Sequence, residues 1–214
     1  MSSHLRSYSW LDAIARRLRA DESASQIAEF ALSLPLLVVF VVGIFDFSGA
    51  LALKQKLTNA AREGARVAAA DPATDLVGGV TPVPVSVVDA FRVVDNYLLS
   101  ENLNDCGLST AEPGPAPSPA LTWSVTQNST GCPGVGIVFT INRGYYFPQT
   151  GATSPTSSCT PQTPGTQTAL IGTCVSIQYA YKWRFNNVIT LLVPSATYAS
   201  VSYITTTATA FNEN

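Results

Sequence analysis

The chain has 214 residues, of which 46% are hydrophobic and only 12% are charged, and its formal net charge at pH 7 is −2. This length accommodates one membrane anchor and one domain of about 140 residues. The small negative charge gives no electrostatic basis for binding nucleic acid, so we expect no nucleic-acid partner.

Residues 1–24 are basic, and apolar side chains recur among their arginines at helical spacing. We expect a cytoplasmic leader. Two interpretations of it stay open: a segment held near anionic lipid headgroups, or a solvated tail that only sets the topology.

Residues 25–53 form the most apolar part of the chain, and between Ile27 and Leu53 only Glu29 and Asp46 are ionisable. A helix over this stretch exceeds the roughly 30 Å hydrocarbon core of a bilayer, and a helix satisfies its own backbone hydrogen bonds in lipid. A cleaved secretory signal has an apolar core of roughly 7–15 residues and a small-residue cleavage site, neither of which is found here. The sequence therefore predicts a transmembrane helix with the lipid bilayer as its partner.

The two carboxylates of this helix each allow two interpretations. Glu29 either sits at headgroup level in water, or, if a peptidase cut between Ala24 and Ser25, neutralises the new terminal ammonium of a neighbouring subunit. Asp46 either pairs with another helix inside the membrane or lies at the outer interface.

Residues 54–70 are predicted to continue the helix beyond the membrane, because they are rich in strong helix formers. Small residues repeat every four positions at Ala60, Gly64 and Ala68, and a second row follows at Ala61, Ala65 and Ala69. Such rows permit close helix packing, and we expect them to contact neighbouring subunits. Asp71-Pro72 should end the helix.

Residues 71–214 are predicted to form a periplasmic or extracellular α+β domain. Ser86-Val-Val-Asp89 fits a capping box that opens a second helix. The apolar stripe of that helix should pack on a sheet, and Asp89 and Asp95 are assigned to its polar face. Alternating residues predict antiparallel strands over 121–126, 136–142, 174–185 and 198–211. The fold class is α+β, with a long N-terminal helix followed by a second helix on a small antiparallel sheet.

All four cysteines lie on the C-terminal side of the anchor: Cys106, Cys132, Cys159 and Cys174. This distribution predicts two disulfides in an oxidising compartment. Short loops favour the pairs Cys106–Cys132 and Cys159–Cys174, although three pairings are possible. Because basic residues flank both ends of the anchor equally, the cysteines decide the orientation: the N-terminus lies in the cytoplasm and the domain lies outside.

No arrangement of residues in the sequence indicates an enzyme. The only histidine, His4, lies in the leader, and the domain has neither a Gly-x-Ser-x-Gly motif nor cysteines at metal-ligand spacing. We expect no catalytic residue, no metal site and no cofactor.

Three stretches resemble a known family: Ala28–Pro35 (AEFALSLP), Gly43–Phe47 (GIFDF) and Leu57–Arg66 (LTNAAREGAR). They are similar to the N-terminal signature of TadE-like proteins, the pilin-like minor components of the bacterial tight-adherence (Flp/Tad) pilus system. The resemblance implies a pilin-like fold and cleavage by a prepilin peptidase between Ala24 and Ser25, which makes Glu29 the fifth mature residue. Members of this family more often carry glycine where this chain has Ala24. They often carry an acidic residue at the position of Asp46, which favours an intramembrane contact.

The function that this resemblance implies is structural. We expect a single-pass inner-membrane subunit that takes part in the assembly or structure of a type IVc-like pilus, together with other pilin-like subunits and pilus assembly proteins. The alternative is a membrane-tethered adhesin outside any filament, whose loops at 113–119 and 148–168 bind a surface or glycan.

Overall fold

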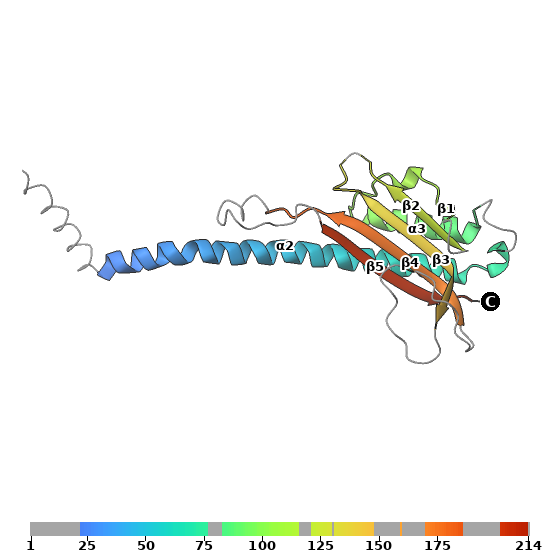
Figure 1. The fold of residues 1–214 in the computed structure, drawn as a ribbon, viewed down its shortest axis with the longest axis horizontal. Helices are drawn as coiled ribbons and strands as arrows, with labels where there is room; N and C mark the ends of the chain where they lie inside the picture. The colour runs from blue at the N-terminus through green and yellow to red at the C-terminus, as the bar shows by residue number, and fades with distance from the viewer. Residues whose placement is uncertain are drawn as a thin grey trace, which may run out of the picture. The chain divides into compact units, whose positions relative to one another are not determined.

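The computed structural model describes residues 22–76, 83–115, 121–129, 131–147, 159, 170–185 and 202–213. The leader before residue 22 and the polar excursion at 148–168, apart from Cys159, lie outside the described residues. The described residues form two helices and five strands (Figure 1): α2 (Glu22–Ala70), α3 (Val85–Ser100), β1 (Gly114–Pro115), β2 (Thr122–Gln127), β3 (Ile137–Phe147), β4 (Leu170–Tyr181) and β5 (Ser202–Phe211). A short 3-10 helix, η1 (Ala73–Leu76), follows α2, and another, η2 (Leu108–Thr110), lies between α3 and β1.

The chain divides into two compact units. One consists of Met1–Phe47 with Phe185–Tyr198, and the other of Ser48–Arg184 with Ala199–Asn214. The helix α2 belongs to both, since the division falls between Phe47 and Ser48. The sheet, α3 and the C-terminal half of α2 make up the second unit.

The helix α2 confirms that the predicted apolar helix and its continuation form one helical segment of 49 residues. It contains Pro35, which removes one backbone donor from the helix interior. It ends at Ala70, directly before Asp71-Pro72, because a residue that precedes proline is disfavoured in the α conformation.

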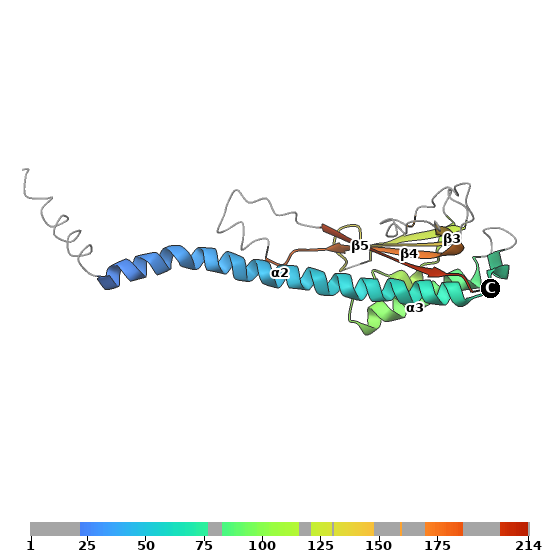
Figure 2. The ribbon, with the colours of Figure 1, turned by 90° about the horizontal axis from the view of Figure 1, so that it is seen from below.

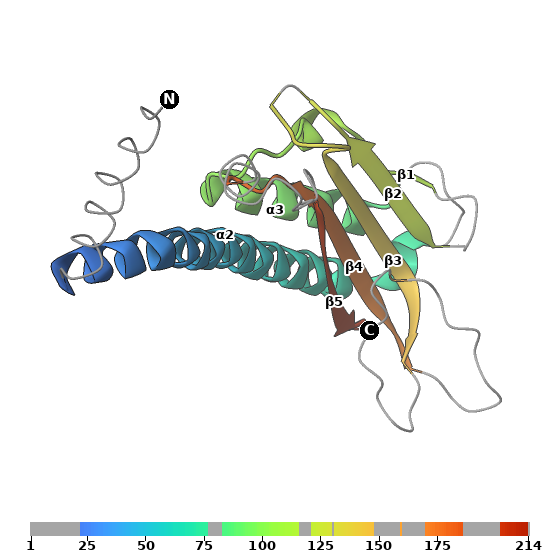
Figure 3. The same ribbon diagram turned by 60° about the vertical axis from the view of Figure 1, so that its left-hand side comes forward.

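The sheet is entirely antiparallel, with the strand order β1-β2-β3-β4-β5 (Figure 3). The four predicted strands are present, and β1 adds a two-residue edge that the sequence did not predict. The predicted bounds of the third strand, 174–185, were wrong at both ends. The strand β4 begins at Leu170, which pairs with Phe147 of β3, and it ends at Tyr181. A register shift between Asn142 and Tyr145 lets β3 continue to this pairing.

Both helical segments of the second unit pack on one face of this sheet (Figure 2). The predicted stripe of α3 is confirmed, because Val87, Phe91, Val94 and Leu98 are buried. The ring of Phe91 meets that of Phe139 edge to face, with the ring centroids 5.3 Å apart. Alternate residues of β2, β3 and β4 supply the rest of the core, including Trp123, Ile137, Ile141, Val175 and Ile177.

The predicted capping box was wrong. Pro84 is the N-cap of α3, no side chain caps the helix, and Ser86 is buried within the first turn. Proline suits this position because its fixed φ matches the chain entering the helix and its missing N–H costs nothing there.

Candidate functional site: the N-terminal half of α2 and the domain contacts around it

The apolar half of α2 has no core of its own chain to cover it. Among the described residues, the segment Ser25–Ala70 is the one helix long and apolar enough to cross a membrane, and its most apolar part is not buried. Leu32, for example, is 83% exposed, and the same is true to a lesser degree of the other large side chains of this half: Ile27, Phe30, Leu36, Leu37, Phe40, Ile44, Phe45 and Phe47. Such a surface requires lipid or other apolar helices around it.

The predicted processing and assembly residues lie at the N-terminal end of this half. Ala24 and Ser25 fall within the first turn of α2, and the Glu29 side chain is exposed one turn later. The structure therefore places Ser25 and Glu29, both exposed, within about one turn of each other.

Asp46 contacts its own chain. Its side chain is 1% exposed, and its carboxylate Oδ2 accepts a hydrogen bond from the backbone N–H of Phe185 at 3.2 Å. Because a backbone N–H of this chain already binds the Asp46 carboxylate, we propose a contact with a neighbouring subunit for Glu29 alone.

The small-residue rows also contact this chain, which corrects the expectation that they face neighbouring subunits. Ala60, Gly64 and Ala68 are buried, and so are the residues of the second row. A Cβ placed on Gly64 would lie 2.6 Å from Cγ2 of Val94, so α2 and α3 approach each other closely at this point. The rows do permit tight helix packing, but α3 and the sheet of the same chain occupy them.

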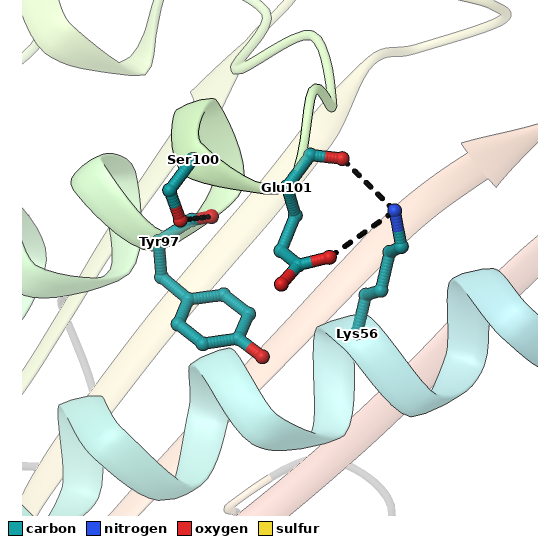
Figure 4. A network of polar contacts seen from close by, with 4 residues as sticks. All are labelled: Lys56, Tyr97, Ser100 and Glu101. Carbon is teal, nitrogen blue, oxygen red and sulfur yellow. Dashed lines mark hydrogen bonds and ion pairs between the residues drawn. The ribbon is translucent and has the colours of Figure 1, made fainter.

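A polar clamp joins α2 to the end of α3 (Figure 4). Lys56 Nζ donates to the backbone carbonyl of Glu101 at 2.9 Å and forms an ion pair with the Glu101 carboxylate at 3.2 Å. A cation beside a helix C-terminus is also favoured by the helix dipole. The clamp fixes where α3 lies along α2.

The two disulfides have the pairing that the sequence analysis favoured because it closes short loops. Cys106–Cys132 and Cys159–Cys174 have Cα atoms 5.6 Å and 5.5 Å apart. The first joins the segment after α3 to the β2–β3 connection, and the second joins Cys159 to β4. Among the described residues, no group of three or more His, Cys, Asp or Glu side chains could hold a metal ion.

A pair of interacting carboxyl groups, of which Asp95 is buried, was missed by the sequence analysis. Asp95 was assigned to the polar face of the second helix, but its side chain is only 8% exposed, and it lines a cavity of about 400 Å³. Burial raises the pKa of Asp95 to about 6, and the negative charge of Asp105 and a hydrogen bond between the two side chains add to the rise. Burial acts to raise the pKa of Asp105 as well, but hydrogen bonds from the backbone of Ser109 and Gly107 outweigh it and lower that pKa.

Tyr179 extends this cluster toward the sheet. Its hydroxyl donates to the carbonyl of Asn104 at 2.9 Å, and burial together with the charge of Asp105 raises its pKa. The Tyr179 hydroxyl thus ties β4 to the segment after α3.

Comparison with protein families tests the resemblance to TadE-like proteins. Residues 24–66 match the TadE-like protein family. The match begins at Ala24, spans the exposed half of α2, including Glu29 and Asp46, and ends within the buried small-residue rows. It confirms the family resemblance inferred from the sequence over this stretch of the chain. Neither the comparison with curated proteins nor that with solved structures gives a match.

Proposed function

We propose that this chain is a TadE-like, pilin-like structural subunit that takes part in the assembly or structure of a bacterial tight-adherence pilus. The observation that carries the proposal is the overlap of two independent features. The TadE-like match covers residues 24–66, and the same residues contain the exposed apolar half of α2. The family signature thus lies on the part of the chain that must be covered by lipid or by other subunits.

The proposed location is the bacterial inner membrane, crossed once by the segment 25–53. Two disulfides in the C-terminal domain support a periplasmic domain, since disulfides persist in oxidising compartments, and the N-terminus then lies in the cytoplasm. In this arrangement the segments 1–24, 25–53, 54–70 and 71–214 act as leader, transmembrane helix, helix continuation and periplasmic domain. The partners are the bilayer, other pilin-like subunits and pilus assembly proteins.

The proposed assembly step uses the N-terminus that processing creates. Prepilin peptidase cuts between Ala24 and Ser25, and the Glu29 carboxylate then neutralises the terminal ammonium of a neighbouring subunit. An ion pair between helices at the edge of the lipid replaces two costly isolated charges, which gives docking a polar determinant beside an apolar surface.

The experiment is to purify the chain from membranes and determine its mature N-terminus by mass spectrometry. A chain beginning at Ser25 supports the subunit, whereas a chain that retains residues 1–24 and is absent from sheared surface filaments supports the tethered adhesin. The variant Glu29→Gln should insert normally but give less pilus in the sheared fraction. Glu112→Gln, an exposed carboxylate of the domain, is the matched control and should leave pilus output unchanged. Normal output from Glu29→Gln would refute the role of Glu29.

A further inference from the structure

The chain alternates aromatic and basic residues as it leaves β4, in the order Tyr181, Lys182, Trp183, Arg184, Phe185. The aromatic side chains are buried or half-buried, whereas both basic side chains are exposed. We call Tyr181–Arg184 the aromatic-basic turn.

The aromatic rings of this turn are held in place. Trp183 Nε1–H donates to Ser202 Oγ at 2.8 Å, and the ring of Trp183 meets that of Tyr181 edge to face at 5.2 Å. The hydrogen bond joins the segment after β4 to the start of β5, and the ring contact joins that segment to the last residue of β4. The turn therefore presents its basic side chains from a fixed backbone.

A contact with α2 gives the level of the turn along that helix. The Tyr181 hydroxyl lies 2.9 Å from the position of a Cβ on Gly49, so the tyrosine rests directly against Gly49.

The same level coincides with the outer edge of the hydrocarbon core. Glu29 is the last carboxylate before the apolar run, so the core begins near Phe30. About 20 helical residues span the roughly 30 Å of hydrocarbon, which brings its outer edge close to Gly49. Tyrosine and tryptophan rings with a polar end favour this headgroup level, and lysine favours the anionic phosphates there.

We propose that the aromatic-basic turn binds the outer headgroup layer of the membrane, with the Lys182 ammonium paired to lipid phosphate and the Trp183 ring among the headgroups. This second membrane contact rests on the anchor in the proposed function. It sets the depth of the anchor, since the turn resists being drawn into hydrocarbon or lifted into water. Anionic phospholipids, and not a neighbouring protein, are its ligand, because the exposed Lys182 cation and the half-buried Trp183 ring meet at bilayer height.

The first test places the full-length chain in phosphatidylcholine vesicles that contain phosphatidylglycerol and lipids brominated near the headgroup. The difference in fluorescence between the wild type and Trp183→Phe isolates Trp183, and Trp123 is fully buried in the core. We expect the brominated lipids to quench the Trp183 signal. Trp183 that is quenched by aqueous acrylamide as strongly as in detergent would overturn the proposal, and so would Trp183 shielded from both quenchers, which would mean that protein covers it.

The second test measures lipid binding to the full-length chain in detergent by native mass spectrometry. Lys182→Gln should weaken phosphatidylglycerol binding about fivefold and leave phosphatidylcholine binding unchanged. Arg92→Gln, which removes an exposed cation from α3, is the matched control and should change neither. Equal effects of the two substitutions would overturn the proposal. Flotation of the vesicles separates the two failures: a chain that does not float refutes the anchor, whereas a floating chain without these signals refutes only the turn.

Discussion

Asp95→Asn should stabilise this protein at neutral pH, although it removes a charged residue. A carboxyl group whose pKa is raised on folding binds its proton more tightly in the folded state, so it contributes stability below its unfolded pKa and loses that contribution as pH rises through its folded pKa. For Asp95 this window runs from 3.8 to about 6. At pH 7 the folded chain therefore holds a buried carboxylate whose Oδ1 has no hydrogen-bond partner among the described residues, beside the charge of Asp105.

The magnitude follows from the pKa. A rise from 3.8 to about 6 corresponds to roughly 3 kcal/mol of stability lost between acid and neutral pH. Because Asp95 borders a cavity and solvent that enters a cavity screens a charge, we expect ~1–3 kcal/mol. Asparagine is neutral throughout, keeps the shape of the side chain, and its amide can donate to the Asp105 carboxylate.

The assay is thermal unfolding of the full-length chain in detergent, with the disulfides intact, between about pH 4 and pH 7. The wild type should lose stability as pH rises, and Asp95→Asn should remove most of that loss and raise the Tm at pH 7 by roughly 2–10 °C. The lowered pKa of Asp105 acts in the opposite direction, but only as pH falls below about 4. Asp89→Asn, on the exposed side of α3 beside Arg92, should keep the pH dependence of the wild type. An Asp95→Asn variant that is less stable at pH 7 and retains the wild-type slope would refute this account.

Three further perturbations test the packing of the domain by the same unfolding assay. Gly64→Ala should lower the free energy of unfolding by ~1–3 kcal/mol, because its Cβ meets Val94 at 2.6 Å, whereas Gly43→Ala meets nothing within 4 Å and should leave the domain unchanged. Lys56→Met should cost less than about 1 kcal/mol, since both partners of the ion pair are 37% exposed. The disulfides join residues 26 and 15 positions apart, and reducing each should lower the free energy of unfolding by ~3 kcal/mol. An unchanged free energy of unfolding after reduction would contradict this.

The pattern of hydrophobic residues in the sequence predicts most of the fold. The unbroken apolar run gives α2, the spacing of Val87, Phe91, Val94 and Leu98 gives the buried face of α3, and alternation gives the four main strands. Each of these patterns is local, because it depends only on which side chains share a face within one element. The strand ends were predicted less well, since pairing between β3 and β4 decides them.

What sequence could not supply is the identity of each partner. The spacing of Ala60, Gly64 and Ala68 shows that something packs there, but not that the partner is α3 of the same chain. Asp95 has an ordinary position on a helix, and part of the rise in its pKa comes from Asp105 in the segment beyond that helix. Arg143 is likewise fully buried within β3, where it donates to the backbone carbonyl of Asp71 at 3.1 Å. No local pattern marks a contact between residues so far apart in the chain.

Burial of the small-residue rows also narrows how the proposed subunit can meet its neighbours. With Ala60, Gly64 and Ala68 occupied by its own domain, the apolar half of α2 is what remains for lipid or for another helix. Moving this surface from lipid to a neighbouring apolar helix yields little hydrophobic free energy, since lipid tails are as apolar as leucine. Association must then depend on close packing and on polar groups, and Glu29 is the exposed carboxylate of this half. Substitutions among its exposed leucines that preserve volume should therefore leave pilus output nearly intact, whereas loss of the Glu29 charge should not.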